Sequence, residues 1–233
     1  MAQTTTPAAA THHGGHGHSQ HHPPHLKHYF VSSEQQFDAA KMGMWLFLMT
    51  EILLFSGMFV AYAVFRFLQP EVFDKSSELL NPWLGGLNAL VLLASSFTVA
   101  LGIHFAQRDD RRKLVINLIL TLLFAGVFMV VKYFEYTDKF SHGIFPGGHF
   151  HPHGDYNAYD IPYAPIFFSI YFVMTGIHGV HVLVGMGLFG WLTWRANRGD
   201  FTSEYYTPVE LTGLYWHLVD IIWIFLFPLL YLI

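Results

Sequence analysis

The sequence contains no cysteine and few charged residues, and each absence excludes a class of protein. Without cysteine there can be no disulfide, no thiolate zinc site, no iron–sulfur cluster and no haem attached through a CxxCH motif. A thiolate-bridged copper centre is excluded for the same reason. Charged residues make up 12% of the 233-residue chain, against about 25% in soluble domains. The net charge of −4 offers no basic surface, so we expect no nucleic-acid partner.

Long apolar runs account for this composition. The chain is 53% hydrophobic and 18% aromatic, with a mean hydropathy of +0.36. A helix that crosses a membrane needs about 20 mostly apolar residues. Five runs reach that length, so the sequence predicts an all-α integral membrane protein, a bundle of five transmembrane helices. We expect the spans at about 42–67, 83–106, 113–136, 164–195 and 208–232.

Residues 1–40 differ from the rest of the chain, because they combine His, Gly, Pro and Thr without any apolar period. This composition is typical of a disordered segment. It lacks the basic start and short apolar core of a signal peptide. The sequence thus predicts a disordered His-rich N-terminal tail and short lead-in over 1–40, and a membrane domain over 41–233. The tail is either a solvated leader or a segment that captures metal.

The distribution of Lys and Arg predicts the orientation, because these residues are enriched in cytoplasmic segments. A cytoplasmic N-terminus places eight of them inside and three outside. We therefore expect the N-terminus in the cytoplasm and the C-terminus in the periplasm, with the His-rich 137–163 loop facing outward as a weak metal site or a polar cap against a partner. The inside set is Lys27, Lys41, Arg108, Arg111, Arg112, Lys113, Arg195 and Arg198, and the outside set is Arg66, Lys75 and Lys139.

Charged side chains inside the spans are informative, because a charge in hydrocarbon costs about 2.5–3.5 kcal/mol on insertion scales and so usually faces protein or water. Glu51 lies about 14 Å along its helix from Met42, close to the bilayer midplane. It is a candidate for proton relay, for a lipid site, or for a hydrogen bond between helices. Lys132 and Glu135 are spaced i,i+3, which predicts an ion pair within one helix.

The fourth run carries two histidines and a regular set of glycines. His178 and His181 share one side with Gly185, and both sides of this helix therefore look suited to close helix contact. The glycines of the opposite side are Gly176, Gly179, Gly187 and Gly190.

The fifth run places Glu210, His217 and Asp220 on one face. Together with the fourth-run histidines they predict a hydrogen-bonded network of His and acids. Metal or haem ligation by the same histidines is the alternative that the spacing leaves open.

Four stretches together resemble one family, namely subunit III of the haem–copper terminal oxidases, the cytochrome c oxidase subunit III family. The resemblance covers roughly residues 41–233, and its most specific strings are TGIHGVHV and YWHLVDIIWIFLF. The chain resembles the five-helix bacterial form of the family rather than the seven-helix form. The stretches are MWLFLMTEILLFSGMFVAYAVF, KYFEYTDKF, FFSIYFVMTGIHGVHVLVG and LYWHLVDIIWIFLFPLLYL.

This resemblance implies a non-redox accessory subunit of a bacterial aerobic terminal oxidase, a proton-pumping cytochrome c oxidase of the inner membrane. It implies no catalytic residue, metal or cofactor in this chain, with haem and copper in the partner subunits. The expected partners are catalytic subunit I directly, subunit II, other respiratory complexes in a supercomplex, and bound phospholipid. The expected roles are to stabilise the catalytic subunit, to support proton uptake and to hold phospholipid.

The resemblance also suggests residue roles. It assigns lipid binding and support of proton uptake to Glu51, His181 and Arg195. The chain has Val60 and Val64 where mitochondrial members have Trp and His, so part of their lipid contact is missing here. The polar positions of the last three spans form the expected structural network, namely Lys132, Glu135, His178, Glu210, His217 and Asp220.

Other functions remain open at this point. Within the family, the alternatives are subunit III of a quinol oxidase and a paralogue associated with nitric-oxide reductase. A different class is an autonomous membrane haem or metal protein that uses His178, His181 and His217. A third is a small transporter with Glu51 as its proton carrier.

Overall fold

The structure is a computed structural model that describes residues 30, 32–145 and 163–233. Most of the predicted His-rich tail, and residues 146–162 of the His-rich loop, lie outside the described residues. The described chain forms helices throughout, apart from short connections and one isolated bridge between Thr202 and Tyr205. The helices are α1 Ser33–Leu68, α2 Pro70–Ser77, α3 Pro82–Gln107, α4 Arg111–Ser141, α5 Ala164–Arg198 and α6 Thr207–Tyr231.

Five of these helices, all except α2, are long and apolar enough to cross a membrane. This confirms the prediction of an all-α membrane protein with five long apolar helices. α1 starts at Ser33 rather than near residue 41, because the Ser32 hydroxyl accepts a hydrogen bond from the Gln35 amide and caps the helix. The sequence reasoning did not anticipate α2, whose eight residues are too few for a span.

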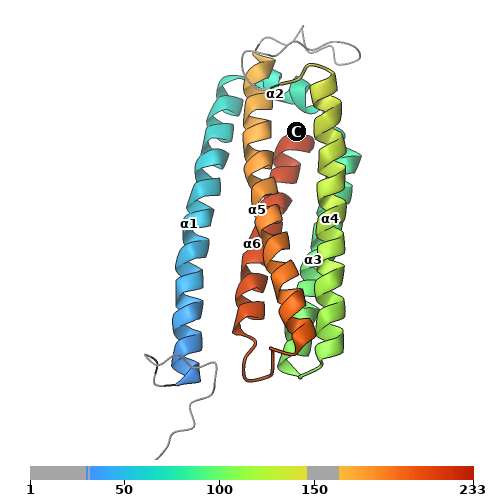
Figure 1. The fold of residues 1–233 in the computed structure, drawn as a ribbon. Coiled ribbons are helices and arrows are strands. Elements are labelled where there is room, and N and C mark those ends of the chain that lie inside the picture. The colour runs from blue at the N-terminus through green and yellow to red at the C-terminus, as the bar shows by residue number, and fades with distance from the viewer. Residues whose placement is uncertain (1–29, 31, 146–162) are drawn as a thin grey trace, which may run out of the picture.

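The helices run up and down, so their connections gather at two ends (Figure 1). The start of α1, the α3–α4 turn and the α5–α6 loop lie at one end, called here the N-terminal end. α2, the end of α4 and the C-terminus lie at the other, the C-terminal end. This arrangement puts together the segments that the Lys and Arg count assigns to one side. Which end faces the cytoplasm remains a prediction.

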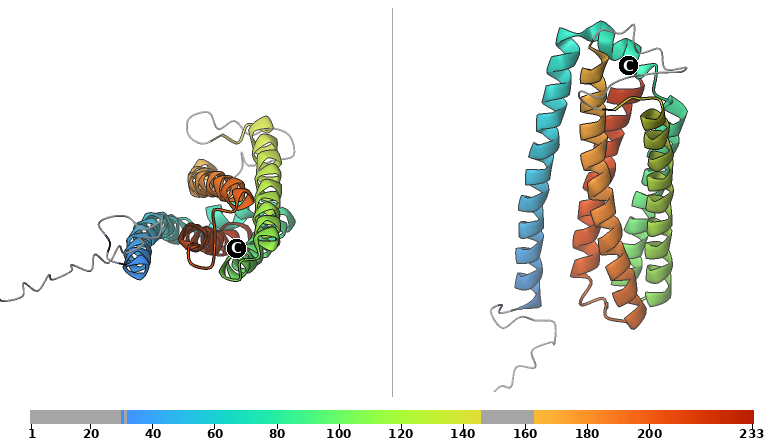
Figure 2. Two further views of the ribbon diagram at one scale, coloured as in Figure 1. Left: turned by 60° about the horizontal axis from the view of Figure 1, so that its bottom comes forward. Right: turned by 45° about the horizontal axis from the view of Figure 1, so that its top comes forward.

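α3, α4, α5 and α6 form the packed bundle, and α1 stands at its edge beside α6 and α5 (Figure 2). Polar contacts attach α1 near both of its ends. At the N-terminal end the Lys41 ammonium lies 2.9 Å from the Glu210 carboxylate of α6. Toward the C-terminal end the Tyr62 hydroxyl donates to the Leu229 carbonyl. Much of the remaining α1 surface is apolar and exposed.

Small residues set the close approach of helices inside the bundle. A Cβ placed on Gly185 of α5 would lie 2.4 Å from the Trp216 ring of α6, so no side chain fits there. Trp216 is fully buried, and its indole nitrogen donates to the Ser95 hydroxyl at 2.9 Å. The expectation of close helix contact on this side of α5 is therefore confirmed.

The opposite glycine face of α5 makes no such contact with the described residues. A Cβ on Gly179, Gly187 or Gly190 would meet no atom within 4 Å. On Gly176 it would meet only the Tyr136 hydroxyl, at 4.0 Å. The described residues therefore do not make the close contact expected of this face, and contact of this face with another chain stays a prediction.

A side chain also joins the two connections of the N-terminal end. Asp109 adopts a left-handed backbone, with φ of 57°, which Asp tolerates better than most residues. Its carboxylate accepts a hydrogen bond from the Ser203 amide at 2.6 Å. Hydrogen bonding from the Ser203 side chain, and then from its amide, lowers the pKa of the Asp109 carboxyl below its ordinary value.

We expect Gly185→Ala to lower the free energy of unfolding by about 1–3 kcal/mol, because the added methyl overlaps the buried Trp216 ring. Gly187→Ala is the matched control on the same helix and should change it by less than about 0.5 kcal/mol. Thermal unfolding of the purified protein gives both values. Equal effects of the two substitutions would contradict the packing described for α5 and α6.

We expect the hydrogen bond of Asp109 to make stability depend on pH. The folded pKa lies below the ordinary 3.8, so the stabilisation is complete above about pH 4 and is lost as the pH falls through the folded pKa. Asp109→Asn keeps an acceptor and tolerates the left-handed backbone, but it carries no charge. Thermal midpoints between pH 3 and pH 7 should therefore fall more for the unchanged protein than for Asp109→Asn. Parallel curves would show that the charge at Asp109 contributes nothing.

Candidate functional site

Glu51 of α1 and His181 of α5 meet across the edge of the bundle. The Glu51 Oε2 and His181 Nε2 atoms are 2.8 Å apart. Both side chains are about one-sixth exposed, at 16% and 17%. The two residues are 130 positions apart in the chain; the family resemblance gave them a shared role, and their direct contact is a finding of the structure.

The hydrogen bonds of His181 fix how this pair can share protons. The His181 Nδ1 atom lies 2.8 Å from the Ile177 carbonyl, which can only accept, so Nδ1 must carry a hydrogen. The Nε2 atom then either accepts from a protonated Glu51 or donates to an ionised one. The proton between the two side chains can therefore sit on either partner.

Neighbouring rings hold His181 in place. The Phe55 ring contacts it edge-on at a centroid distance of 5.3 Å. The Tyr215 hydroxyl donates to the His181 backbone carbonyl at 2.9 Å. These contacts come from α1 and α6, so the imidazole of α5 is positioned by both neighbouring helices.

An apolar pocket of about 520 Å³ lies between α1 and α6. It begins at Ile52, the residue after Glu51, and continues toward the C-terminal end. Its apolar lining and elongated position between two spans suit a hydrocarbon chain better than a polar ligand. Its walls are Ile52, Phe55, Ser56, Phe59, Leu218, Ile221, Ile222, Phe225 and Leu229.

The structure does not bring Arg195 to this site. Arg195 follows His181 by fourteen residues on α5, which is about 21 Å along a helix. Its Nε atom donates to the Asp200 carboxylate at 2.9 Å, and its guanidinium lies 5.0 Å from the centroids of the Trp191 and Phe201 rings. The charge of Arg195 is thus already partly matched at the N-terminal end.

The predicted ion pair of α4 lies in a buried cluster toward the C-terminal end. The Lys132 ammonium is 2.8 Å from the Glu135 Oε2 atom and 2.6 Å from the Tyr231 hydroxyl. The Glu135 Oε1 atom accepts from the hydroxyls of Tyr171 at 2.9 Å and Tyr231 at 2.6 Å. Lys139 adds a second ammonium at 4.0 Å. Sequence reasoning found the pair and missed the two tyrosines.

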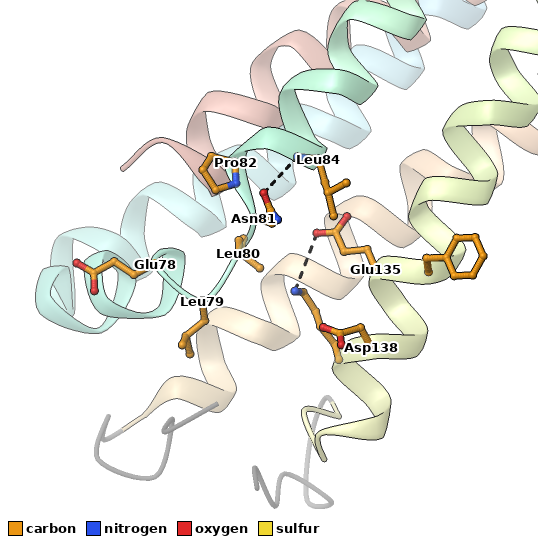
Figure 3. A pocket seen from close by; sticks show the side chains of 10 residues that line it. Glu78, Leu79, Leu80, Asn81, Pro82, Leu84, Glu135 and Asp138 are labelled. Atoms are coloured by element: carbon orange, nitrogen blue, oxygen red, sulfur yellow. Dashed lines mark hydrogen bonds and ion pairs between the residues drawn. The ribbon is translucent and has the colours of Figure 1, made fainter. Parts of the chain in front are cut away.

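A pocket of about 680 Å³ adjoins this cluster. Figure 3 shows Glu135 of α4 facing Leu80 and Asn81 of the α2–α3 connection, with Asp138 one turn further along α4. The Asn81 side chain accepts from the Trp83 and Leu84 amides and so caps α3. The pocket is therefore a cleft between the end of α4 and the start of α3.

The remaining residues of the predicted network form no hydrogen bond with this cluster in the part of the chain that the structure describes. Glu210 pairs with Lys41 at the N-terminal end. The His217 Nδ1 atom lies 2.6 Å from the Ser96 hydroxyl of α3. His178 and Asp220 are buried, and their polar side-chain atoms have no hydrogen-bond partner among the described residues. The pairing of Glu210 with Lys41 and of His217 with Ser96 depends on which helices face each other. Residue spacing along one helix does not reveal this.

The three histidines considered as metal or haem ligands have different neighbours. His178 packs against Trp223, His181 pairs with Glu51, and His217 pairs with Ser96. Among the described residues there is no group of three or more His, Asp or Glu that could hold a metal ion.

These observations define a class, namely a multi-pass membrane protein whose polar side chains lie between apolar helices. The chain belongs to the cytochrome c oxidase subunit III family. The model of that family, described as "Cytochrome c oxidase subunit III", matches residues 32–154 and 155–233.

Curated relatives agree with this assignment. Cytochrome c oxidase subunit 3 of Thermostichus vulcanus is 30% identical, over 84% of this chain and 88% of that protein. Cytochrome c oxidase subunit 3 of a Synechocystis strain is 30% identical, over 100% of this chain and 84% of that protein. The probable quinol oxidase subunit 3 of Staphylococcus haemolyticus is 29% identical, over 83% of this chain and 88% of that protein.

We expect Glu51→Ala to lower the free energy of unfolding by about 1–3 kcal/mol, because it leaves the imidazole of His181 without its partner in a largely buried position. Glu51→Gln should lower it less, since the amide can still donate to Nε2. Leu53→Ala, at a 71% exposed position of the same helix, is the control for lost apolar surface. Thermal unfolding of the assembled complex measures the stability change caused by each of the three substitutions. A loss for Glu51→Ala no greater than that for Leu53→Ala would mean that the pair does not stabilise the protein.

Proposed function

We propose that this chain is the non-redox accessory subunit III of a bacterial cytochrome c oxidase in the inner membrane. It stabilises the catalytic subunit, supports its proton uptake and holds structural phospholipid. Membership of the subunit III family supports assembly into an oxidase complex. The observation that carries the finer proposal is the Glu51–His181 pair, placed beside an apolar pocket between two spans.

The lipid part of the proposal is supported by the attachment of α1. α1 meets α6 through polar contacts near its two ends, and the pocket of about 520 Å³ lies between these contacts. An acyl chain there would bury apolar surface on both helices. In this arrangement Glu51 and His181 stand at the edge of the lipid site, while Arg195 contributes at the N-terminal end and not at the pair.

The chemistry of the pair supports the proposed role in proton uptake. The Nδ1 hydrogen of His181 is committed to the Ile177 carbonyl, so Nε2 and Glu51 share the exchangeable proton. Both side chains keep some exposure, and a proton can therefore leave or join without disruption of the bundle. The N-terminal end, which carries most of the Lys and Arg residues, is proposed to face the cytoplasm.

The proposed partners are subunit I directly, subunit II, and other respiratory complexes in a supercomplex. The exposed apolar face of α1 supports a partner or lipid on that side. Haem and copper are proposed to reside in the partner subunits. The relative named as a quinol oxidase subunit keeps a quinol oxidase as the second candidate, because the electron donor binds another subunit.

The test is an optical spectrum of the complex purified through this chain from native membranes, recorded before and after the chain is stripped off. We expect haem absorbance to co-purify and then to stay entirely with the partners. A Soret band that follows the isolated chain would overturn the proposal in favour of an autonomous cytochrome. A colourless preparation at both stages would overturn it in favour of a transporter or an assembly factor.

A further inference from the structure

Unpaired polar groups are concentrated in the middle of the α3–α6 bundle. Asn88 of α3, His178 of α5, and Asp220 and Trp223 of α6 are each at most 2% exposed. Eight buried side-chain nitrogen and oxygen atoms lack a hydrogen-bond partner among the described residues, and seven of them belong to these four residues. The eighth is the Ser76 hydroxyl in α2. Among the described residues, the unmet hydrogen bonding is thus concentrated in these four side chains.

Ring contacts place the residues of α5 and α6 side by side. The imidazole of His178 and the indole of Trp223 have centroids 5.1 Å apart. Asp220 precedes Trp223 by three residues, which puts both on one face of α6. The Ser96 hydroxyl comes close enough to interact with the Asp220 carboxyl, although its hydrogen bond goes to His217.

Two contacts fix the level of Asn88 in the bundle. α3 and α6 run in opposite directions, and Gly85 of α3 faces Phe227 of α6. Ten residues or nearly three turns further along α3, the Ser95 hydroxyl accepts a hydrogen bond from the indole of Trp216. Asn88 lies between these two contacts on the buried side of α3, and it is therefore level with Trp223. We call Asn88, His178, Asp220 and Trp223 the central polar layer.

The mixture of donors and acceptors in this layer selects its ligand. The Trp223 indole only donates, while Asn88 and neutral His178 each both donate and accept, and the Asp220 carboxylate accepts. A cation would meet the donors, and it would also meet the Lys132 ammonium, which lies 4.6 Å from the Trp223 ring centroid. An anion would meet the oxygen atoms of the Asp220 carboxyl, which only accept hydrogen bonds unless the group is protonated. Water both donates and accepts, and it can satisfy every member.

We propose that the central polar layer binds a cluster of internal water molecules inside this subunit. Buried water commonly makes about three hydrogen bonds to polar groups that are otherwise unsatisfied. None of its four residues lines the proposed lipid pocket, and none forms a hydrogen bond with Glu51 or His181. It gives the protein interior a hydrated layer at a depth where hydrocarbon surrounds the bundle.

The test is X-ray radiolytic labelling of the intact complex, in which hydroxyl radicals form from bound water and oxidise the side chains beside it. We expect the oxidation rates of Trp223 and His178, each divided by the intrinsic reactivity of its side chain with hydroxyl radical, to be severalfold higher than that of Phe73. The Phe73 ring is equally buried, at 1% exposed, and it packs against the Tyr62 and Phe167 rings. Oxidation of Trp223 and His178 at the Phe73 rate would overturn the proposal. This comparison needs no substitution and holds even if a variant fails to assemble.

A matched pair of variants tests the assignment to these residues. Asn88→Leu removes two of the unpaired atoms and should slow the oxidation of Trp223 toward the Phe73 rate. Asn117→Leu removes a buried amide whose nitrogen is already bonded to the Lys113 carbonyl at 2.9 Å, and it should leave the Trp223 rate unchanged. Equal rates of Trp223 oxidation in assembled complexes of both variants would show that Asn88 does not hold the water.

Discussion

A polar side chain on a membrane-spanning helix must find its partner inside the protein, because hydrocarbon supplies none. This constraint organises the whole structure. Lys132 and Glu135 satisfy it within one helix and then add the hydroxyls of Tyr171 and Tyr231 from two others. Glu51 satisfies it with a histidine from another helix. The polar residues therefore decide which helices face each other, while the apolar residues fill the contacts that result.

The same constraint explains how α1 can stand at the edge of the bundle and still be fixed. Lys41, Glu51 and Tyr62 each reach a partner on α5 or α6, at three levels along the helix. Between the levels of Glu51 and Tyr62, the Phe59 ring of α1 and the Phe225 ring of α6 are 6.5 Å apart, and an apolar pocket lies beside them. A helix held by continuous close packing would leave no room for a ligand. Discrete polar contacts allow both a fixed position and an open pocket.

The sequence predicted features that depend on a single helix, but it predicted contacts between two helices only incompletely. The five long helices follow from run length, and the Lys132–Glu135 pair follows from i,i+3 spacing. The family resemblance gave Glu51 and His181 a shared role, but their direct contact was not predicted, because no local rule connects residues so far apart. α2 was not predicted, because eight residues of mixed polarity are too few to indicate a helix clearly. The pairing of His217 with Ser96 depends on the register of α3 against α6, which the sequence does not display.

The two ionisable pairs differ in a way that bears on function. The Lys132–Glu135 pair is almost fully buried, at 9% and 3% exposed, and tyrosine hydroxyls bond to both partners. Any change of its protonation would leave a buried charge uncompensated, so this pair serves the architecture. The Glu51–His181 pair is more exposed, has one bond between its partners, and stands beside a pocket. Its proton can move between the two groups without a net change of charge. Of the two pairs, the one at the edge is therefore suited to exchange with its surroundings, as the proposed role in proton uptake requires.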